Sequence, residues 1–210
     1  MIEKEQIKFS LIESDLTEFD KKKLLELLRK ENDQSILAKL SDQIVFDYLD
    51  IVQKSNFLKL FSIEYNNEII AYAITSIKPK YLVSEFKSLK VKIFLSLVLN
   101  FKIITLFNII FSTLNLDLIF LKKENLKKVK ENLNLNLIAV ESKYQSKGIG
   151  NLFLRKIISH YKELEKPKYM ICETYDQRAI KFYLDRCGFK IIGKKLRIPK
   201  NLYVLEYEFK

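Results

Sequence analysis

Glycine, proline and cysteine are all scarce in this sequence. Its 210 residues include only four glycines, where average usage of roughly 7% would give about fourteen or fifteen. With three prolines as well, collagen-like and linker-rich architectures are excluded. A chain with so little glycine is expected to use it where the backbone needs its freedom, which draws attention to Gly148, Gly150, Gly188 and Gly193.

Cysteine and histidine are too few for the sites they usually build. Cys172 and Cys187 cannot form a disulfide scaffold and have no metal-ligand spacing, and His160 is the only histidine. Since His160 also has no partner near it in the sequence, we expect neither a metal site nor a Ser-His or Cys-His nucleophile. The first residues, MIEKEQIKFS, lack the apolar stretch of a signal peptide, so the expected compartment is the reducing cytosol.

The net charge is +11, and most of it belongs to one segment. Eleven lysines and four acidic residues lie between Lys78 and Glu131, which gives +7, whereas the rest of the chain holds 26 basic and 22 acidic groups, or +4. This concentration favours one cationic surface over a general nucleic-acid coat. Hydrophobic residues at 48% and charged residues at 30% fit one soluble globular domain over residues 1–210.

Apolar periodicity and turn residues predict an α/β chain. The expected strands span 6–12, 57–64, 68–77, 134–140, 168–174, 189–193 and 202–209, with Asn66-Asn67 as a hairpin turn. The expected helices are one that Asp15 and Glu18 start with capping-box spacing, one over 35–53, two or three within 79–131, one from Gly148–Gly150 to about Glu163, and one from Asp176 to Gly188.

The most informative stretch follows the expected strand 134–140, where Gly148 and Gly150 lie at the start of a helix. Helix N-termini offer unpaired N–H groups and a positive dipole end, and glycine allows a phosphate to approach the backbone. Lys147 adds positive charge. The pattern indicates a phosphate or pyrophosphate cradle, although it matches neither the P-loop nor the dinucleotide glycine motif. The alternative is a plain strand-to-helix turn.

Two motifs resemble those of GNAT-type N-acetyltransferases. The stretch 145–150, Gln-Ser-Lys-Gly-Ile-Gly, matches the family signature Q/R-x-x-G-x-G/A. The stretch 176–189 is similar to the family element N-x-x-A-x-x-x-Y-x-x-x-G-F, with Asp176 in place of Asn and one extra residue between Tyr183 and Gly188. The match covers roughly 134–193 and implies a mixed, mostly antiparallel central sheet flanked by helices.

The resemblance also implies an acetyl-CoA site and catalytic residues. Backbone groups of strand 134–140 would pair with pantetheine and polarise the thioester carbonyl, the loop would hold the pyrophosphate, and Asp176 would lie beside the cofactor. Tyr183 would protonate the departing thiolate, and Glu173 or Glu141 would accept the proton of the amine. Tyr183 could instead be a core tyrosine, and both glutamates could be solvated charges at strand ends. The implied cofactor-binding residues are Ile138, Ala139, Val140, Gln145, Ser146, Lys147, Gly148, Ile149, Gly150, Asn151 and Asp176.

The activity implied by the resemblance is transfer of acetyl from acetyl-CoA to a primary amine by direct attack. The Lys- and Phe-rich segment 79–131, expected to be a helical insertion between the third and fourth strands, makes the sequence similar to acetyltransferases of bacterial surface-polysaccharide synthesis. That similarity implies a nucleotide- or lipid-linked amino sugar as acceptor. The alternative is a non-catalytic acyl-CoA-binding or membrane-adaptor module of the same fold. Nucleic-acid binding is disfavoured, because so apolar a segment suits lipid better than base stacking.

The segment 79–131 also raises the question of a membrane. Ile93–Leu116 has one charge in 24 residues, long enough to cross a bilayer core at about 1.5 Å per residue. We expect it not to cross, because Lys102 lies near its centre and a crossing would separate the hairpin 57–77 from strand 134–140. The helices are expected to lie on the anionic inner face of the cell membrane, with the lysines of 78–92 and 122–130 at the headgroups. The alternative is a homodimer interface or packing on the domain itself.

Overall fold

One seven-stranded sheet forms the centre of the molecule. The computed structural model describes residues 6–33, 35–81, 85–99, 102–114, 116–118, 120–164 and 167–209. The strand order is β1-β2-β3-β4-β5-β7-β6, in which β4 and β5 are parallel and all other neighbours are antiparallel. The expected fold class, a mixed and mostly antiparallel sheet flanked by helices, is confirmed.

The elements follow the order expected from the sequence. The strands are β1 (Ile7–Leu11), β2 (Leu58–Tyr65), β3 (Glu68–Ser76), β4 (Leu133–Val140), β5 (Tyr169–Thr174), β6 (Lys190–Lys195) and β7 (Leu202–Glu208). The α-helices are α1 (Glu18–Glu31), α2 (Asp42–Lys54), α4 (Lys87–Leu99), α5 (Ile103–Thr113), α6 (Lys123–Glu131), α7 (Ile149–Leu164) and α8 (Gln177–Cys187). Short 3₁₀ turns are η2 (Leu37–Lys39), η3 (Pro79–Tyr81), η4 (Leu116–Leu118) and η5 (Ser142–Tyr144).

Two helix starts differ from those predicted. The capping box of α1 is formed by Thr17 and Asp20, because the Thr17 hydroxyl accepts from the Asp20 amide at 3.1 Å while the Asp20 carboxylate accepts from the Thr17 amide. The prediction from Asp15 and Glu18 was therefore wrong. The expected helix 35–53 is divided, since the chain forms η2, becomes extended at Leu40 and Ser41, and begins α2 only at Asp42.

The turn between β2 and β3 confirms the predicted hairpin. Asn66 and Asn67 have φ angles of 53° and 62°. Positive φ at both central residues defines the tight turn whose twist matches that of paired strands, and asparagine tolerates this region better than most residues. The hairpin positions β3 at the middle of the sheet, where it pairs with β4.

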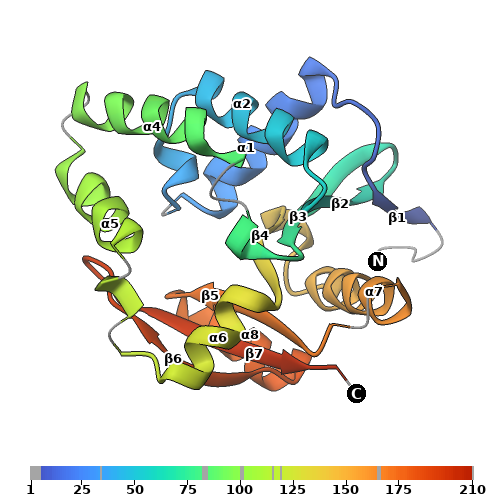
Figure 1. Ribbon diagram of the computed structural model, residues 1–210. Helices are drawn as coiled ribbons and strands as arrows, with labels where there is room; N and C mark the ends of the chain where they lie inside the picture. Colours follow the sequence, from blue (N-terminus) through green and yellow to red (C-terminus); the bar gives the residue numbers. More distant parts are fainter. Residues whose placement is uncertain are drawn as a thin grey trace.

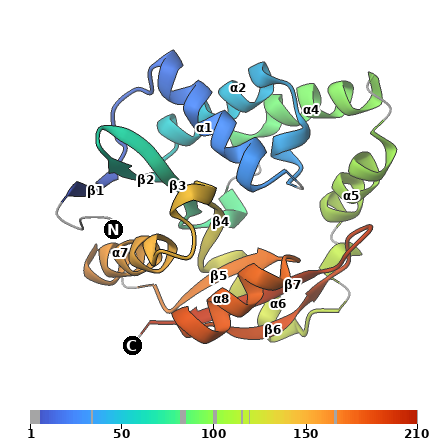
Figure 2. The same ribbon diagram turned by 180° about the vertical axis from the view of Figure 1, so that it is seen from behind.

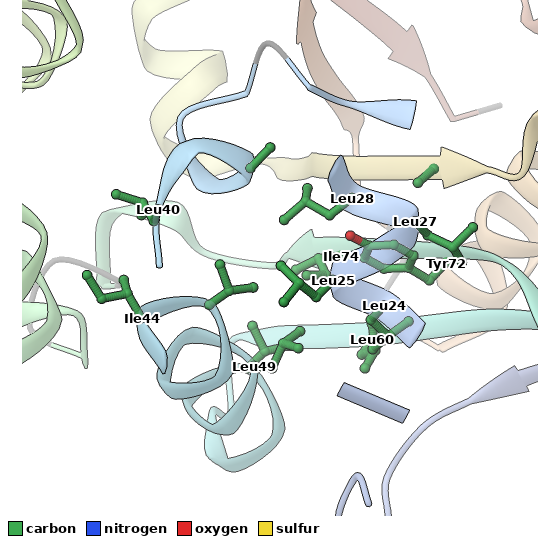
Figure 3. Close-up of a cluster of buried hydrophobic side chains, with 14 of the residues drawn as sticks. Leu24, Leu25, Leu27, Leu28, Leu40, Ile44, Leu49, Leu60, Tyr72 and Ile74 are labelled. Carbon is green, nitrogen blue, oxygen red and sulfur yellow. The ribbon is translucent and has the colours of Figure 1, made fainter. Parts of the chain in front are cut away.

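Helices cover both faces of the sheet (Figures 1 and 2). The helices α1, α2 and α4 pack on one face through a cluster that includes Leu24, Leu28 and Leu49 from the helices and Tyr72 from β3 (Figure 3). The helices α7 and α8 pack on the opposite face, where Phe153 and other residues of α7 meet side chains of β2 to β5. Burial of these aliphatic and aromatic side chains provides the main driving force for the fold.

The described residues between β3 and β4 are largely helical and include the helices α4, α5 and α6. The helix α4 packs beside α2, whereas α6 packs on β5 and β7 through Val129, Ile171 and Val204. Figures 1 and 2 show α5 at the edge of the molecule, where it connects α4 on one side with α6 on the other. In the described part of the chain, no helix is both long enough and apolar enough to span a membrane.

A buried carboxylate attaches α6 to the sheet. The Glu206 side chain in β7 is 0% exposed and pairs with Lys128 of α6 at 2.7 Å and with Lys190 of β6 at 3.2 Å. The hydrogen bond with Glu206 raises the pKa of Lys128. The pair therefore stabilises the folded state throughout the neutral range, and this contribution is lost only as pH rises above the ordinary pKa of lysine.

We predict that Lys128→Met lowers the free energy of unfolding by about 1–3 kcal/mol, because it leaves the buried Glu206 carboxylate with one partner instead of two. The matched control is Lys127→Met, which removes an exposed lysine one residue away whose partner Glu131 lies at 4.0 Å. The control should change stability by no more than about 0.5 kcal/mol. Urea unfolding followed by circular dichroism measures both variants, and equal losses would contradict the role given to Lys128.

Candidate active site

The strands β4 and β5 are neighbours over only part of their length. They pair as parallel strands from Leu133 to Leu135, opposite Met170–Cys172. The strand β4 stays paired with β3 as far as Val140, but the register shifts between Leu135 and Leu137, so Asn136 forms a bulge. Among the described residues, 136–140 have no strand partner on the side of β5. We call this side of 136–140 the free β4 edge.

Backbone groups of Ile138 and Val140 point toward the free β4 edge. The Ile138 carbonyl accepts from the Asn32 side chain at 3.1 Å, and the Val140 carbonyl accepts from the Gln145 side chain at 2.8 Å. The N–H and C=O of one strand residue point to the same side, so the amides of Ile138 and Val140 face this edge as well. Ala139 pairs with Tyr72 of β3 and its side chain is buried in the core. The amides of Ile138 and Val140 can therefore donate to an extended ligand, while the two carbonyls already accept from Asn32 and Gln145.

The loop after β4 leads directly into the N-terminus of α7. Ser146 and Gly148 both have positive φ, 59° and 85°. The Gly148 carbonyl accepts the first intrahelical bond, from Leu152, which leaves the amides of Ile149, Gly150 and Asn151 without acceptors inside the helix. Gln145, Ser146 and Lys147 are exposed. Free amides, the positive end of the helix dipole and the Lys147 charge therefore lie together at the N-terminus of α7, as expected for an anion site.

Gly150 lies against α8. A Cβ atom at this position would meet the Phe182 ring at 3.5 Å, which is ordinary van der Waals contact. A small residue is therefore tolerated there, whereas a larger one would displace Phe182 or point into the space in front of the helix N-terminus. This contact also brings α8, and with it Tyr183, next to the start of α7.

Glu31, the last residue of α1, accepts hydrogen bonds from the loop between β4 and α7. One of its carboxylate oxygens accepts from the Ser142 amide at 2.8 Å and from the Ser142 hydroxyl at 2.5 Å, and the other accepts from the Gln145 side chain at 2.7 Å. A carboxylate at a helix C-terminus is disfavoured by the helix dipole, so these three hydrogen bonds must outweigh that cost. Sequence analysis missed Glu31, since no local pattern connects it with residues 111 or 114 positions away.

Tyr183 is held in the core between α8 and the sheet. Its ring lies 5.3 Å from that of Phe182 and 5.1 Å from that of Phe189, and only 5% of the residue is exposed. Burial raises the pKa of the Tyr183 hydroxyl well above its ordinary value, with smaller effects from Cys172 and Cys187. The hydroxyl is therefore protonated at neutral pH, which suits a proton donor and also suits a core tyrosine.

The extra residue between Tyr183 and Gly188 is accommodated in the last turn of α8. Gly188 has φ of 75°, and its amide donates to the Tyr183 carbonyl, five residues back instead of the usual four. The Phe189 amide donates to the same carbonyl at 3.1 Å. The widened turn ends the helix at the glycine, as the sequence predicts, and the insertion lies after Tyr183 in the chain.

The three carboxylates expected near the reaction centre already have partners. Glu173 pairs with Lys195 of β6 at 2.6 Å. Glu141 is buried and pairs with Lys143 at 3.2 Å through one oxygen, while its amide donates to β3. Asp176 caps α8 by accepting from the amides of Arg178 at 2.7 Å and Ala179 at 3.2 Å. Burial opposes ionisation of Asp176, but these amides and the Arg178 charge outweigh it and lower the pKa.

Cys172 and His160 are packed as structural residues. Cys172 is a buried free cysteine, and burial raises the pKa of its thiol well above the ordinary value, so it is a poor nucleophile. The ring of His160 lies edge-on against Phe61 at 5.1 Å and next to Tyr161. Within the described ranges, no group of three or more His, Cys, Asp or Glu side chains is arranged to hold a metal ion.

Comparison with known proteins agrees with this geometry. The model of the acetyltransferase (GNAT) family matches residues 119–189, which include β4, the loop and α7. No curated protein matches the chain. Among solved structures, the ribosomal-protein-S18-alanine N-acetyltransferase of Escherichia coli superposes with a TM-score of 0.57 at 13% identity, covering 96% of this chain and 93% of that one.

Two other solved structures share the fold. A spermidine N-acetyltransferase chimera from Vibrio cholerae and hSSAT has a TM-score of 0.60 at 10% identity, with 97% of this chain and 95% of that one covered. A GNAT family acetyltransferase from Elizabethkingia anophelis with acetyl-CoA bound has a TM-score of 0.51 at 14% identity, with coverage of 98% and 100%. The chain has the GNAT fold, and its residues 119–189 match the model of the GNAT acetyltransferase family.

We predict that Glu31→Ala raises the Kd for acetyl-CoA by roughly tenfold. The loop before α7 loses its hydrogen bonds to the Glu31 carboxylate, and the free energy of about one strong hydrogen bond is then needed to order the loop on binding. The matched control is Glu26→Ala, which removes an exposed glutamate from the same helix. Calorimetric titration with acetyl-CoA measures both. Unchanged affinity in Glu31→Ala would show that the loop is ordered without this carboxylate.

Proposed function

We propose that the protein is an N-acetyltransferase that uses acetyl-CoA to acetylate a primary amine. The observation that carries the proposal is the juxtaposition of the free β4 edge with the glycine loop at the start of α7. The edge amides of Ile138 and Val140 suit the carbonyl oxygens of pantetheine and of its thioester, and the loop amides suit a pyrophosphate. A solved structure of the same fold has acetyl-CoA bound, which supports acetyl-CoA as the ligand proposed here.

The residues of this chain would act on the thioester that acetyl-CoA supplies when bound. The Val140 amide would donate to the thioester carbonyl and stabilise the negative charge that develops on its oxygen. As the amine forms its bond to the carbonyl carbon and the C–S bond breaks, the Tyr183 hydroxyl would give its proton to the departing sulfur. A carboxylate would take the proton lost by the amine, directly or through water. Glu173 and Glu141 are the candidates, and each would first have to share its lysine partner.

The acceptor is proposed to be an amino sugar, carried on a nucleotide or a lipid, as in surface-polysaccharide synthesis. In this proposal the acceptor approaches from the side of α5. There, Asn108 holds the loop between β6 and β7 by donating to the Ile198 carbonyl at 2.7 Å and accepting from the Ile198 amide at 2.9 Å. The segment 79–131 would thus form a wall of the acceptor site, at the cytoplasmic face of a membrane for a lipid-linked acceptor.

The second candidate function is a non-catalytic acyl-CoA-binding module of the same fold. The two glutamates favour it, because one carboxylate oxygen of each is held in an ion pair with a lysine. A screen of amines with acetyl-CoA, read as release of free thiol, separates the two functions. Turnover on any amine supports the enzyme, whereas tight acetyl-CoA binding with no turnover on amino sugars, polyamines or peptides supports the module.

We predict that Gly150→Asp abolishes the rise in melting temperature that acetyl-CoA produces, because it brings negative charge beside the pyrophosphate. The first turn of a helix favours an acidic residue, so the variant itself should fold. Gly150→Ala is the matched control and should keep the shift, since its Cβ would make only ordinary contact with Phe182. A full shift in Gly150→Asp would reject the pyrophosphate site.

We predict that Tyr183→Phe lowers kcat by roughly 10²–10⁴-fold, the usual contribution of a general acid, and leaves the Kd for acetyl-CoA unchanged. The variant removes only a hydroxyl from a ring held by Phe182 and Phe189, so packing is preserved. Steady-state rates with the amine found by the screen provide the test. Full activity would make Tyr183 a core residue.

A further inference from the structure

The helix α4 has two apolar faces, and only one of them is covered. Leu89 and Leu97 are buried, and Phe86 and Ile93 pack against the same core cluster as α2. On the other side, apolar side chains recur at the spacing of one helical face and are exposed. They are Val91, Phe94, Leu95, Val98 and Leu99.

The next helix, α5, also exposes apolar side chains on one face. In α5, Leu106 and Ile109 pack on the core cluster and the buried Asn108 holds the loop at Ile198. The exposed apolar side chains again follow one helical face: Ile103, Ile104, Phe107, Ile110 and Leu114. Leu99, the last residue of α4, is 76% exposed, and Ile103, the first residue of α5, is 71% exposed. We call these ten side chains the α4–α5 face.

The charges that α4 and α5 themselves carry are positive. Residues 86–114 include no acidic residue, and Lys87 and Lys90 lie one turn before Val91 and Phe94 on the same side of α4. Of the four acidic residues in 78–131, Glu85 accepts a hydrogen bond from Ser55, Asp117 is buried, and Glu124 and Glu131 lie in α6. On the neighbouring helix α2, Asp47 pairs with Lys92 of α4 at 2.6 Å. A second copy of this chain would bring further lysines to these margins, whereas an anionic lipid surface offers both hydrocarbon for the apolar face and negative charge for the lysines.

We propose that the α4–α5 face binds the surface of an anionic lipid bilayer, with Leu99 and Ile103 entering deepest. The helices lie along the membrane and do not cross it. Binding depends on apolar insertion together with lysine contacts to headgroups, so it weakens with salt. This surface activity does not depend on acetyl transfer, and it would bring the proposed active site close to an acceptor carried on a lipid.

Flotation of the full chain with vesicles of phosphatidylcholine containing 30% phosphatidylglycerol (about a third anionic lipid, chosen to give a strongly negative surface) tests the proposal. The wild type should float with these vesicles, float less in high salt, and stay unbound with pure phosphatidylcholine. The double variant Leu99→Glu/Ile103→Glu should lower the partition coefficient at least about tenfold, since each buried aliphatic side chain contributes about that factor or more.

Leu164→Glu is the matched control, because Leu164 is 68% exposed and is the last residue of α7. The helix α7 lies away from α4 and α5 in both views (Figures 1 and 2). It should float like the wild type. An unchanged melting shift with acetyl-CoA in all variants shows that they are folded and keeps this test separate from that of the acetyltransferase.

Three results would overturn the proposal. The first is a wild type that stays unbound with the anionic vesicles. The second is flotation that Leu99→Glu/Ile103→Glu leaves unchanged. The third is a dimer in solution, measured by light scattering, that the double variant dissociates while neither protein binds vesicles, since a second copy would then cover the face.

Discussion

The separation of β4 from β5 is the constraint on which the rest of the molecule depends. The bulge at Asn136 shifts the side chains of β4 by one position, so Leu133 and Leu135 face α7 while Leu137 and Ala139 face α1 and α2. The Asn136 side chain accepts from the Ser76 hydroxyl at 3.1 Å, which holds the bulge against β3. After the bulge, β4 follows β3 and leaves β5, and backbone amides in the middle of a sheet become available to a ligand.

A sheet that opens in the middle needs other contacts to hold its two halves together. On one side, the end of α1 reaches the opening, where Asn32 donates to Ile138 and Glu31 accepts from the loop before α7. On the other side, the segment between β3 and β4 passes from α2 to the strands β5 to β7. It is anchored there by Asn108 at Ile198 and by Lys128 at Glu206. These contacts lie around the gap between β4 and β5. They leave the amides of Ile138 and Val140 on the free β4 edge available to an extended ligand.

The general plan of the sheet and the glycine loop could be predicted from the sequence, but the bulge could not. Residues 133–137 read Leu-Asn-Leu-Asn-Leu, a regular alternation that predicts three leucines on one face of a strand. The bulge breaks that pattern because β4 must match β3 and β5 at once, which is a property of the assembled sheet. The role of Glu31 could not be predicted for the same reason, since its partners lie more than a hundred residues away in the sequence. The start of α1 was missed because two capping candidates, Asp15 and Thr17, lie within three residues and only the fold selects between them.

The helix α4 shows why periodicity alone leaves the role of a helix open. Its apolar residues surround the axis on nearly all sides, which is typical of a helix buried in a core or surrounded by lipid. The fold buries only the side with Leu89 and Leu97 against α2, because the other side faces away from the sheet. The ten large apolar side chains of the α4–α5 face are then exposed to water. Their exposure costs free energy and does not stabilise the fold. A cluster of exposed apolar side chains of this size is typical of a binding surface. Lysines border it, and residues 86–114 include no acidic residue, which favours an anionic lipid bilayer as the partner.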